Sequence, residues 1–345
     1  MNYNARFVLR KSKMHEQYNL INELADKITY SFKSNYEVGR VLEYETDCDF
    51  SVHAISRLPL LGDYSRVWFF AQAWDNDELS FLFSKNIRKF VVDNEQDLKV
   101  LLSFIENNDV QIDLLLRMKL KENTIHTGKH FVFGMYSKQV NDYLPKLKEN
   151  LKINKVGIHF HRKTQNISEW SLKYELEQCI NEESWKFIDI VNIGGGLPGK
   201  YKNYRREVQE HIFSKINELK EFLEEYKITL MIEPGRFIAG PAVELHTTIK
   251  NIYDNNIIVN CSVYNSAMDT FISHIRLLVK GELDDGKGEG YTIKGCTPCS
   301  MDIFRYRVFL DKPKIGDKLI FLNAGAYNFS TDFSGLDEMM TEVIE

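Results

Sequence analysis

Eight short apolar segments, separated by amphipathic stretches, run through the first two thirds of the sequence. We predict strands at residues 28–32, 50–53, 67–71, 89–92, 113–118, 156–161, 188–193 and 229–232. Helical periodicity is clearest at residues 13–26, 36–45, 95–107, 137–150 and 206–226. Crossovers between parallel strands need about a dozen residues or more, usually as a helix. The pattern therefore predicts an α/β fold built on a (β/α)8 barrel, with an open doubly wound sheet as the alternative.

The pattern changes after Pro241. Short strand-like segments separated by turn residues follow, at residues 244–253, 256–264, 275–279, 291–293, 306–309 and 318–322. No long helical pattern remains in this part of the sequence. We therefore predict a barrel domain over residues 5–240 and a C-terminal all-β domain over residues 241–345, to which residues 1–4 could also belong.

The charge balance is that of an ordinary globular protein. The 44 lysines and arginines stand against 49 acidic residues, for a net charge of −5. This balance gives no sign of a basic surface for nucleic acid. We find neither an apolar segment long enough to span a bilayer nor a signal-peptide pattern after Met1. The five cysteines are few and odd in number, which favours free thiols. We expect a cytoplasmic protein without nucleic-acid or membrane partners.

Several residues able to do chemistry occur where predicted strands end. Lys33 follows the first strand, Arg117 ends the fifth and His161 ends the sixth. Three glycines at 194–196 follow the seventh strand, and residues 233–236 follow the eighth. In a barrel the carboxyl ends of the strands form the active face, and the loops after the last two strands are a frequent phosphate site. Glycines also let backbone amides approach an anion. Their joint placement indicates an active site.

Two short motifs could bind a metal or carry redox chemistry instead. His159 and His161 alternate along one strand and so point to the same face, but no carboxylate lies near them in the sequence. Cys296 and Cys299 have C-x-x-C spacing, but a second pair of zinc ligands does not occur at suitable spacing. We expect no metal site, and a redox or zinc protein built on these cysteines stays as an alternative.

Together these residues resemble the motifs of fold-type III pyridoxal-phosphate (PLP) decarboxylases, the family of ornithine, diaminopimelate, arginine and carboxynorspermidine decarboxylases. Residues 30–33 resemble the segment that carries the family's Schiff-base lysine, and residues 157–161 its Gly-x-His-x-His motif. Residues 233–236 match its Glu-Pro-Gly-Arg signature, the most specific of the set. Residues 325–327 match its Gly-Ala-Tyr motif, and residues 295–302 resemble its cysteine loop. The resemblance covers nearly the whole chain.

The resemblance implies a PLP-dependent amino-acid decarboxylase, an enzyme that works through a Schiff base and a quinonoid intermediate. It implies that Lys33 carries the cofactor, His161 stacks on its ring, Glu233 keeps the ring nitrogen protonated and Cys299 returns a proton, with Cys296 as the second candidate. The implied cofactor-binding residues are Lys33, Arg117, His161, Thr164, Gly194, Gly195, Gly196, Glu233, Gly235, Arg236 and Tyr327. The cysteine loop would reach the partner's active site in a homodimer with shared sites.

The sequence departs from the family pattern in two places that bear on the substrate. Ser273 stands where ornithine enzymes have the aspartate that binds the distal amine, and a serine supplies no charge. We name Asp269 as the nearest alternative acid, and Asp302 of the cysteine loop as a further substrate contact. The spacing from Cys299 to Asp302 is one residue shorter than in the family. We expect a larger or carboxylated diamino substrate, with Arg276 or another cation at its distal end.

The chain is also shorter than typical members, and we expect it to lack most of the N-terminal segment that adds a strand to the β domain. Besides the redox or zinc protein, three other functions stay open. One is an inactive or regulatory homologue of the antizyme-inhibitor kind. Another is an amino-acid racemase, although racemases of this barrel class place an arginine at the ring nitrogen where this chain has Glu233. The third is decarboxylation of an aminocarboxypropyl group on a larger molecule, as in microcin C-type biosynthesis.

Overall fold

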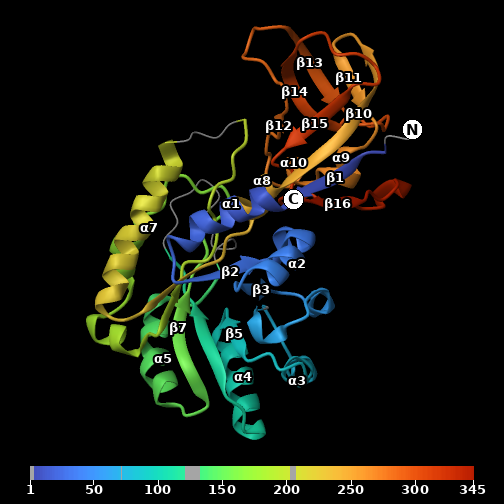
Figure 1. The fold of residues 1–345 in the computed structure, drawn as a ribbon. Helices are drawn as coiled ribbons and strands as arrows, with labels where there is room; N and C mark the ends of the chain where they lie inside the picture. Colours follow the sequence, from blue (N-terminus) through green and yellow to red (C-terminus); the bar gives the residue numbers. More distant parts are fainter. Residues whose placement is uncertain (1–3, 71, 121–132, 203–206) are drawn as a thin grey trace.

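The computed structural model describes residues 4–70, 72–120, 133–202 and 207–345. Two sheets organise these residues: a closed barrel of eight parallel strands and a separate, mixed sheet at the C-terminal end of the chain (Figure 1). The predicted (β/α)8 barrel with a C-terminal β domain is confirmed. No helix in the described ranges is both long enough and apolar enough to cross a membrane.

The barrel strands follow one another in sequence order. They are β2 (Lys27–Ser31), β3 (Asp49–Val52), β4 (Val67–Phe69), β5 (Lys89–Val92), β6 (Ile112–Arg117), β7 (Ile153–His159), β8 (Ile190–Asn192) and β9 (Thr229–Ile232). The last strand pairs with the first, with Lys27 opposite Met231, and so closes the barrel. Residue 71, at the end of the predicted strand 67–71, lies outside the described residues.

Helices and short 3-10 turns connect the barrel strands. The connecting helices are α2 (Tyr36–Glu45), α3 (Asn76–Ser84), α4 (Glu95–Asn108), α5 (Ser137–Glu149), α6 (Leu172–Cys179) and α7 (Glu207–Glu225). The helix α1 (Lys11–Asn22) precedes the first barrel strand, and α8 (Arg236–Ala242) follows the last. Between β3 and β4 the chain forms 3-10 turns at Ile55–Leu60 and Tyr64–Arg66. Residue 206, where the predicted helix 206–226 was to begin, lies outside the described residues.

Large apolar side chains fill the inside of the barrel. Trp68, Val91, Leu115, Ile190 and Met231 form one buried cluster, each from a different strand. The barrel is therefore a packed core, not a pore, as is usual for this architecture. An active site is therefore expected in the loops at the carboxyl ends of the strands.

The second sheet has eight strands. Six follow the path β12-β15-β10-β11-β13-β14, and β1 and β16 extend from β10. Their bounds are β1 (Arg6–Arg10), β10 (Val243–Tyr253), β11 (Asn256–Val259), β12 (Leu278–Val279), β13 (Glu289–Lys294), β14 (Ile303–Leu310), β15 (Lys318–Leu322) and β16 (Thr341–Ile344).

The strand β1 corrects two predictions. It runs antiparallel to β10, with Phe7 opposite Leu245, and parallel to β16. The predicted barrel start at residue 5 was therefore too early, and the β domain does receive an N-terminal strand. The sequence hid this strand because Phe7, Val8 and Leu9 are all buried, so the usual alternation of apolar and polar residues is missing.

The predicted strand 256–264 was too long. The strand β11 ends at Val259, and Val263 begins the short helix α9 (Val263–Ser266), followed by α10 (Asp269–Ile272). Ser262 caps α9, because its hydroxyl accepts a hydrogen bond from the Tyr264 amide at 3.1 Å. These two short helices bring residues of the β domain beside the barrel.

Candidate active site

A cavity of about 260 Å³ opens at the carboxyl ends of the barrel strands. Lys33, Arg117, His161 and Glu233 all line it, although they come from widely separated parts of the sequence. Four of the predicted site residues therefore share one cavity. We call it the Lys33 cavity.

Lys33 lies in a 3-10 turn, Phe32–Ser34, between β2 and α2. Two hydrogen bonds tie this turn to the C-terminal segment. The Tyr327 amide donates to the carbonyl of Ser34 at 2.9 Å, and the Asn35 side chain donates to the carbonyl of Gly325 at 2.8 Å. The predicted Gly-Ala-Tyr motif thus fixes the backbone that carries Lys33.

Glu233 is a buried carboxylate at the end of β9, with an exposed fraction of 2%. One of its oxygens accepts hydrogen bonds from Ser51 Oγ at 2.7 Å and Asn192 Nδ2 at 2.9 Å, and the other lies 3.3 Å from His159 Nε2. Burial raises the pKa of Glu233, but the imidazoles of His159 and His161 and the Ser51 hydroxyl outweigh it and lower the pKa to about 2. Glu233 is therefore ionised across the physiological pH range.

The partners of Glu233 were not among the predicted site residues. Ser51 and Asn192 lie on predicted strands, and strand position alone gives no reason to single out a serine or an asparagine. His159 was noted only as a neighbour of His161. A signal did exist, because all three side chains occur within three residues of a carboxyl strand end.

His161 is a neutral imidazole. The Gly195 amide donates a hydrogen bond to its Nδ1 at 3.1 Å, which leaves the proton of the neutral ring on Nε2. Burial lowers the pKa of His161 to about 3, with a smaller opposing contribution from Glu233. A neutral ring can pack against a flat aromatic ligand without bringing a second charge into the cavity.

The glycine segment packs directly against these two residues. A Cβ at Gly195 would lie 2.8 Å from the carbonyl oxygen of Glu233, and a Cβ at Gly194 would lie 2.3 Å from that of Phe160. Gly194 and Gly196 also have φ values of +64° and +95°, which favour glycine. Within the described part of the chain, the amides of Gly196 and Gly235 donate to no other group. They are available to an anion.

Arg236 lies at the centre of a polar cluster, and it is 3% exposed. Its guanidinium donates to Thr164 Oγ1 at 2.9 Å and to the Tyr201 hydroxyl at 2.9 Å, and more weakly to Ser273 Oγ at 3.4 Å. The guanidinium also forms a two-pronged ion pair with Asp269. Tyr201 is a member of this cluster that the sequence analysis missed.

This ion pair corrects the prediction for Asp269. We named Asp269 as an acid for the substrate's distal amine, but its side chain is fully buried and both carboxylate oxygens bind Arg236. Ser273 likewise faces Arg236. Tyr327 joins the same region, since its ring lies 5.1 Å from the Arg236 guanidinium.

The cysteine loop holds a second correction. Asp302 was named as a substrate contact, but it is 1% exposed and its carboxylate accepts hydrogen bonds from the Val263 amide and from Thr297. It holds the loop in shape. The thiol of Cys299 is exposed and lies 2.9 Å from the Tyr264 hydroxyl, and this hydrogen bond lowers the pKa of Cys299. Burial raises the pKa of Cys296, so Cys299 is the more acidic thiol.

The two histidines do have a carboxylate neighbour in space. His159, His161 and Glu233 each offer a ligand atom, and these atoms lie within 4.8 Å of one another. The barrel fold brings Glu233 beside the two histidines, although no carboxylate lies near them in the sequence. Nδ1 of His161 accepts the Gly195 amide, and one oxygen of Glu233 accepts two hydrogen bonds. Nε2 of His161 and the second oxygen of Glu233 are the atoms that these contacts leave for a ligand.

The depressed pKa values predict how stability depends on pH. Between pH 6.5 and about pH 3, the unfolded chain binds a proton at His161 that the folded chain does not bind. Between pH 4.5 and about pH 2, the same holds for Glu233. As far as these two groups determine it, the free energy of unfolding should therefore be highest above pH 6.5. It should fall as the pH drops, by up to about 1.4 kcal/mol per pH unit for each proton. Urea unfolding of the apoprotein from pH 7 to pH 4 measures this slope.

The matched variants are His161→Gln and His211→Gln, because His211 is an exposed histidine on α7. We expect His161→Gln to flatten the slope and His211→Gln to leave it unchanged. Equal slopes in wild type and His161→Gln would show that His161 does not titrate in this window.

The residues around the Lys33 cavity fit pyridoxal phosphate. In the cavity a ring would contact the ionised Glu233 and the neutral His161. The amides of Gly196 and Gly235, in the segments that follow β8 and β9, would be the donors to a phosphate. Ser34 Oγ and His159 Nδ1 are buried without a hydrogen-bond partner, and the Gly235 backbone packs against Ser34. Buried polar atoms without partners indicate a missing ligand or water.

Comparison with known proteins also points to a pyridoxal-phosphate protein. Residues 11–240 match the family model described as pyridoxal-dependent decarboxylase, pyridoxal binding domain. The ornithine decarboxylase of Caenorhabditis elegans is 25% identical over 297 residues, covering 78% of this chain and 67% of that protein. Antizyme inhibitor 2 of Xenopus laevis is 24% identical over 293 residues, covering 76% of this chain and 62% of that protein.

A third relative has a carboxylated substrate in its name. The 2-[(L-alanin-3-ylcarbamoyl)methyl]-2-hydroxybutanedioate decarboxylase of Staphylococcus aureus is 23% identical over 287 residues, covering 74% of this chain and 70% of that protein. Among solved structures, the arginine decarboxylase of Paramecium bursaria Chlorella virus shares the fold, with a TM-score of 0.79 at 20% identity over 99% of this chain and 96% of that one. Since the family model spans the whole barrel, the chain belongs to the pyridoxal-dependent decarboxylases.

Proposed function

We propose that this protein is a PLP-dependent decarboxylase of an amino acid and that Lys33 holds the cofactor covalently. One observation carries the proposal: Lys33, His161 and Glu233 line the same cavity at the carboxyl ends of the barrel strands. When bound, PLP supplies an electron sink for the electrons that remain when a carboxylate leaves as CO2. The protein's part is to orient the reactants and to hold protons where they are needed.

Each residue has a separate task in this proposal. Glu233 holds a proton at the ring nitrogen, because a buried ionised carboxylate favours the protonated form of a neighbouring base. Neutral His161 packs against the ring. The amides of Gly196 and Gly235 bind the phosphate, while Arg236 orders Thr164, Tyr201 and Asp269 around it. Arg236 is a positioning residue here, since its donors already have partners.

The lining of the Lys33 cavity bears on the substrate. Glu233 is the sole acid among the described residues that line it. Asp269 is bound to Arg236, and Ser273 carries no charge, so neither can neutralise a distal ammonium. A diamine precursor such as ornithine would leave its distal charge unpaired. A substrate with a carboxylate at its distal end avoids this cost, and we propose such a substrate.

A substrate panel tests this proposal. We expect kcat/KM for ornithine and lysine to fall about ten- to a hundredfold below that for a carboxylated diamino acid, the range expected for one missing charged hydrogen bond. The panel comprises ornithine, lysine, arginine, diaminopimelate, carboxynorspermidine and a citrate amide of diaminopropionate, with CO2 release as the readout. A clear preference for ornithine, unchanged in Ser273→Ala, would overturn the substrate class while leaving the decarboxylase proposal intact.

We further propose a homodimer in which Cys299 serves the partner's active site. Cys299 does not line the Lys33 cavity of its own chain. Large apolar side chains near the loop are exposed to solvent: Met301 is 60% exposed and Phe333 is 58% exposed. The Phe333 ring packs against Tyr264, whose hydroxyl contacts the Cys299 thiol. An apolar surface around a reactive thiol suits a protein interface.

A regulatory protein is the second candidate, because the antizyme inhibitor match points to it. That protein is 24% identical to this chain, close to the 25% of the ornithine decarboxylase match. The same panel separates the two functions. PLP binding without CO2 release from any amino acid favours the regulatory protein, and CO2 release excludes it.

A further inference from the structure

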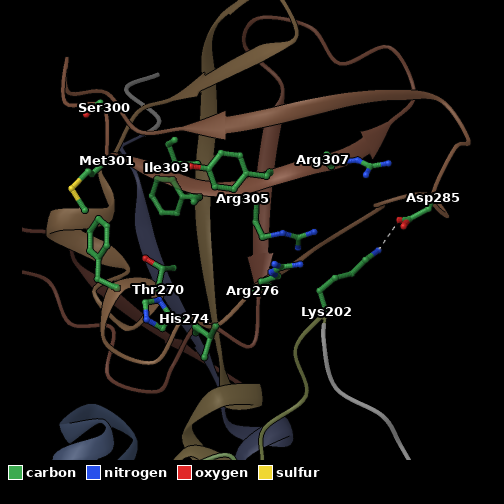
Figure 2. A pocket seen from close by; sticks show the side chains of 14 residues that line it. Lys202, Thr270, His274, Arg276, Asp285, Ser300, Met301, Ile303, Arg305 and Arg307 are labelled. Atoms are coloured by element: carbon green, nitrogen blue, oxygen red, sulfur yellow. Dashed lines mark ion pairs between the residues drawn. The ribbon is translucent and has the colours of Figure 1, made fainter. Parts of the chain in front are cut away.

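A second cavity, of about 660 Å³, lies against the β domain (Figure 2). Arg305 and Arg307 reach it from β14, Arg276 from the segment between α10 and β12, and Lys202 from the loop after β8. None of its lining residues also lines the Lys33 cavity. We call it the arginine cavity.

Positive charge exceeds negative charge in the arginine cavity. The acids close to it are Glu282 and Asp285: Glu282 pairs with Arg305 and with Lys202, each at 2.9 Å, and Asp285 lies 3.8 Å from Lys202. Within the described part of the chain, Arg276 and Arg307 have no acidic partner. Figure 2 shows the side chains of Arg276 and Arg305 pointing toward the same space that Lys202 faces. Such a group of cations repels itself unless an anion joins it.

The buried arginine of this group lacks a partner on one nitrogen. Arg305 is 4% exposed, and its terminal nitrogens donate to Glu282 and to the carbonyl of Leu277. Its Nε is buried and has no hydrogen-bond partner. An unsatisfied charged donor beside a cavity is costly, and a ligand oxygen would relieve that cost.

The backbone around the arginine cavity is also strained. His274 and Arg307, which both line it, have φ values of +51° although neither is a glycine. Arg307 lies where the pairing of β13 with β14 shifts register, between Tyr291 and Ile293. A bulge of this kind re-aims side chains, which accounts for the placement of Arg307 at the cavity.

We propose that the arginine cavity binds a small molecule that carries two or more carboxylates on a carbon frame. Arginines pair carboxylates through two parallel hydrogen bonds, and here they are spread over separate elements. Apolar side chains, among them Phe271, Ile275 and Phe304, form another part of the wall and would contact carbon atoms. The volume falls within the usual range for small-molecule pockets, about 300–1,000 Å³, and exceeds what a lone phosphate needs.

The arginine cavity adjoins the Arg236 cluster through two chain neighbours. Lys202 and Thr270 line the arginine cavity, and the residues that precede them in the chain, Tyr201 and Asp269, both contact Arg236. A ligand in the arginine cavity could therefore change the position of the residues that contact Arg236. The proposal does not rest on decarboxylation, because binding can be measured without turnover.

Calorimetric titration of citrate into the PLP-loaded protein tests the proposal, because the cofactor then fills the other anion site. The probes are citrate, succinate and inorganic phosphate, each at low and high salt. The variants are Arg276→Gln, Arg307→Gln and the double variant. Arg40→Gln is the matched control, since Arg40 is an exposed arginine on α2 that does not line the cavity. Thermal unfolding checks that each variant is folded.

We expect citrate to bind more tightly than phosphate and less tightly at high salt. Each lost arginine should weaken citrate about ten- to a hundredfold, as expected for a charged hydrogen bond, and Arg40→Gln should not. No citrate binding at millimolar concentration would overturn the proposal. So would equal binding by the folded double variant, or binding of phosphate in preference to both carboxylates.

Discussion

Replacing Glu233 by glutamine should leave PLP bound but reduce decarboxylation by about 10²-fold or more, the scale for losing a preorganised charge that acts in the transition state. Glutamine keeps the size and can still accept the hydrogen bonds of Ser51 and Asn192. It cannot hold a proton at the ring nitrogen by charge. The loss should therefore appear in kcat, with the visible spectrum of the bound cofactor retained.

Glu244→Gln is the matched control for this change. Glu244 is a half-buried acid of the β domain that pairs with Arg10 and does not line the Lys33 cavity. Its replacement should cost some stability and little activity. Near wild-type turnover in Glu233→Gln would remove Glu233 from the proposed mechanism.

Mixing two inactive variants, Lys33→Ala and Cys299→Ala, should restore activity. In a dimer with shared sites, a mixed dimer has one site with both residues intact. Random exchange at equal amounts makes roughly half of the dimers mixed, so about a quarter of the wild-type activity should return. The measurement is CO2 release after subunit exchange has been verified with differently tagged chains.

Cys296→Ala is the control for the choice of thiol. The Tyr264 hydroxyl lowers the pKa of Cys299, whereas burial raises that of Cys296, so we expect Cys296→Ala to keep most activity. If verified mixed dimers stay inactive, each active site is complete within one chain. If Cys296→Ala is the damaging change, the proton donor was assigned to the wrong cysteine.

Sequence position alone identified the residues that end barrel strands. Lys33, His161 and Glu233 could be placed together because parallel strands of a barrel share one carboxyl edge. Gly194 and Gly196 could be recognised because a run of glycines follows a predicted strand, and the positive φ values and close packing in the structure explain why glycine stands there. These features follow from local pattern plus one global rule.

The partners of these residues could not be predicted in the same way. Asp269 seemed free in the sequence, but it lies opposite Arg236 only because α10 packs beside the barrel. The sequence says nothing about this docking, which depends on the β domain as a whole. Asp302 likewise holds the cysteine loop because its carboxylate accepts a hydrogen bond from the Val263 amide at the start of α9. The prediction of a strand at residues 256–264 left no place for this helix. The roles of Asp269 and Asp302 were therefore wrongly predicted because the helices α9 and α10 were not predicted.

Reductive labelling of Lys33 tests the central claim most directly. The purified protein, supplied with PLP, should absorb in the visible range, and borohydride should remove this absorbance and fix the cofactor to one peptide. We predict that mass spectrometry finds the label on Lys33, and that Lys33→Ala is not labelled under the same conditions. A protein that stays colourless with added PLP, or a label on any other lysine, would contradict the account.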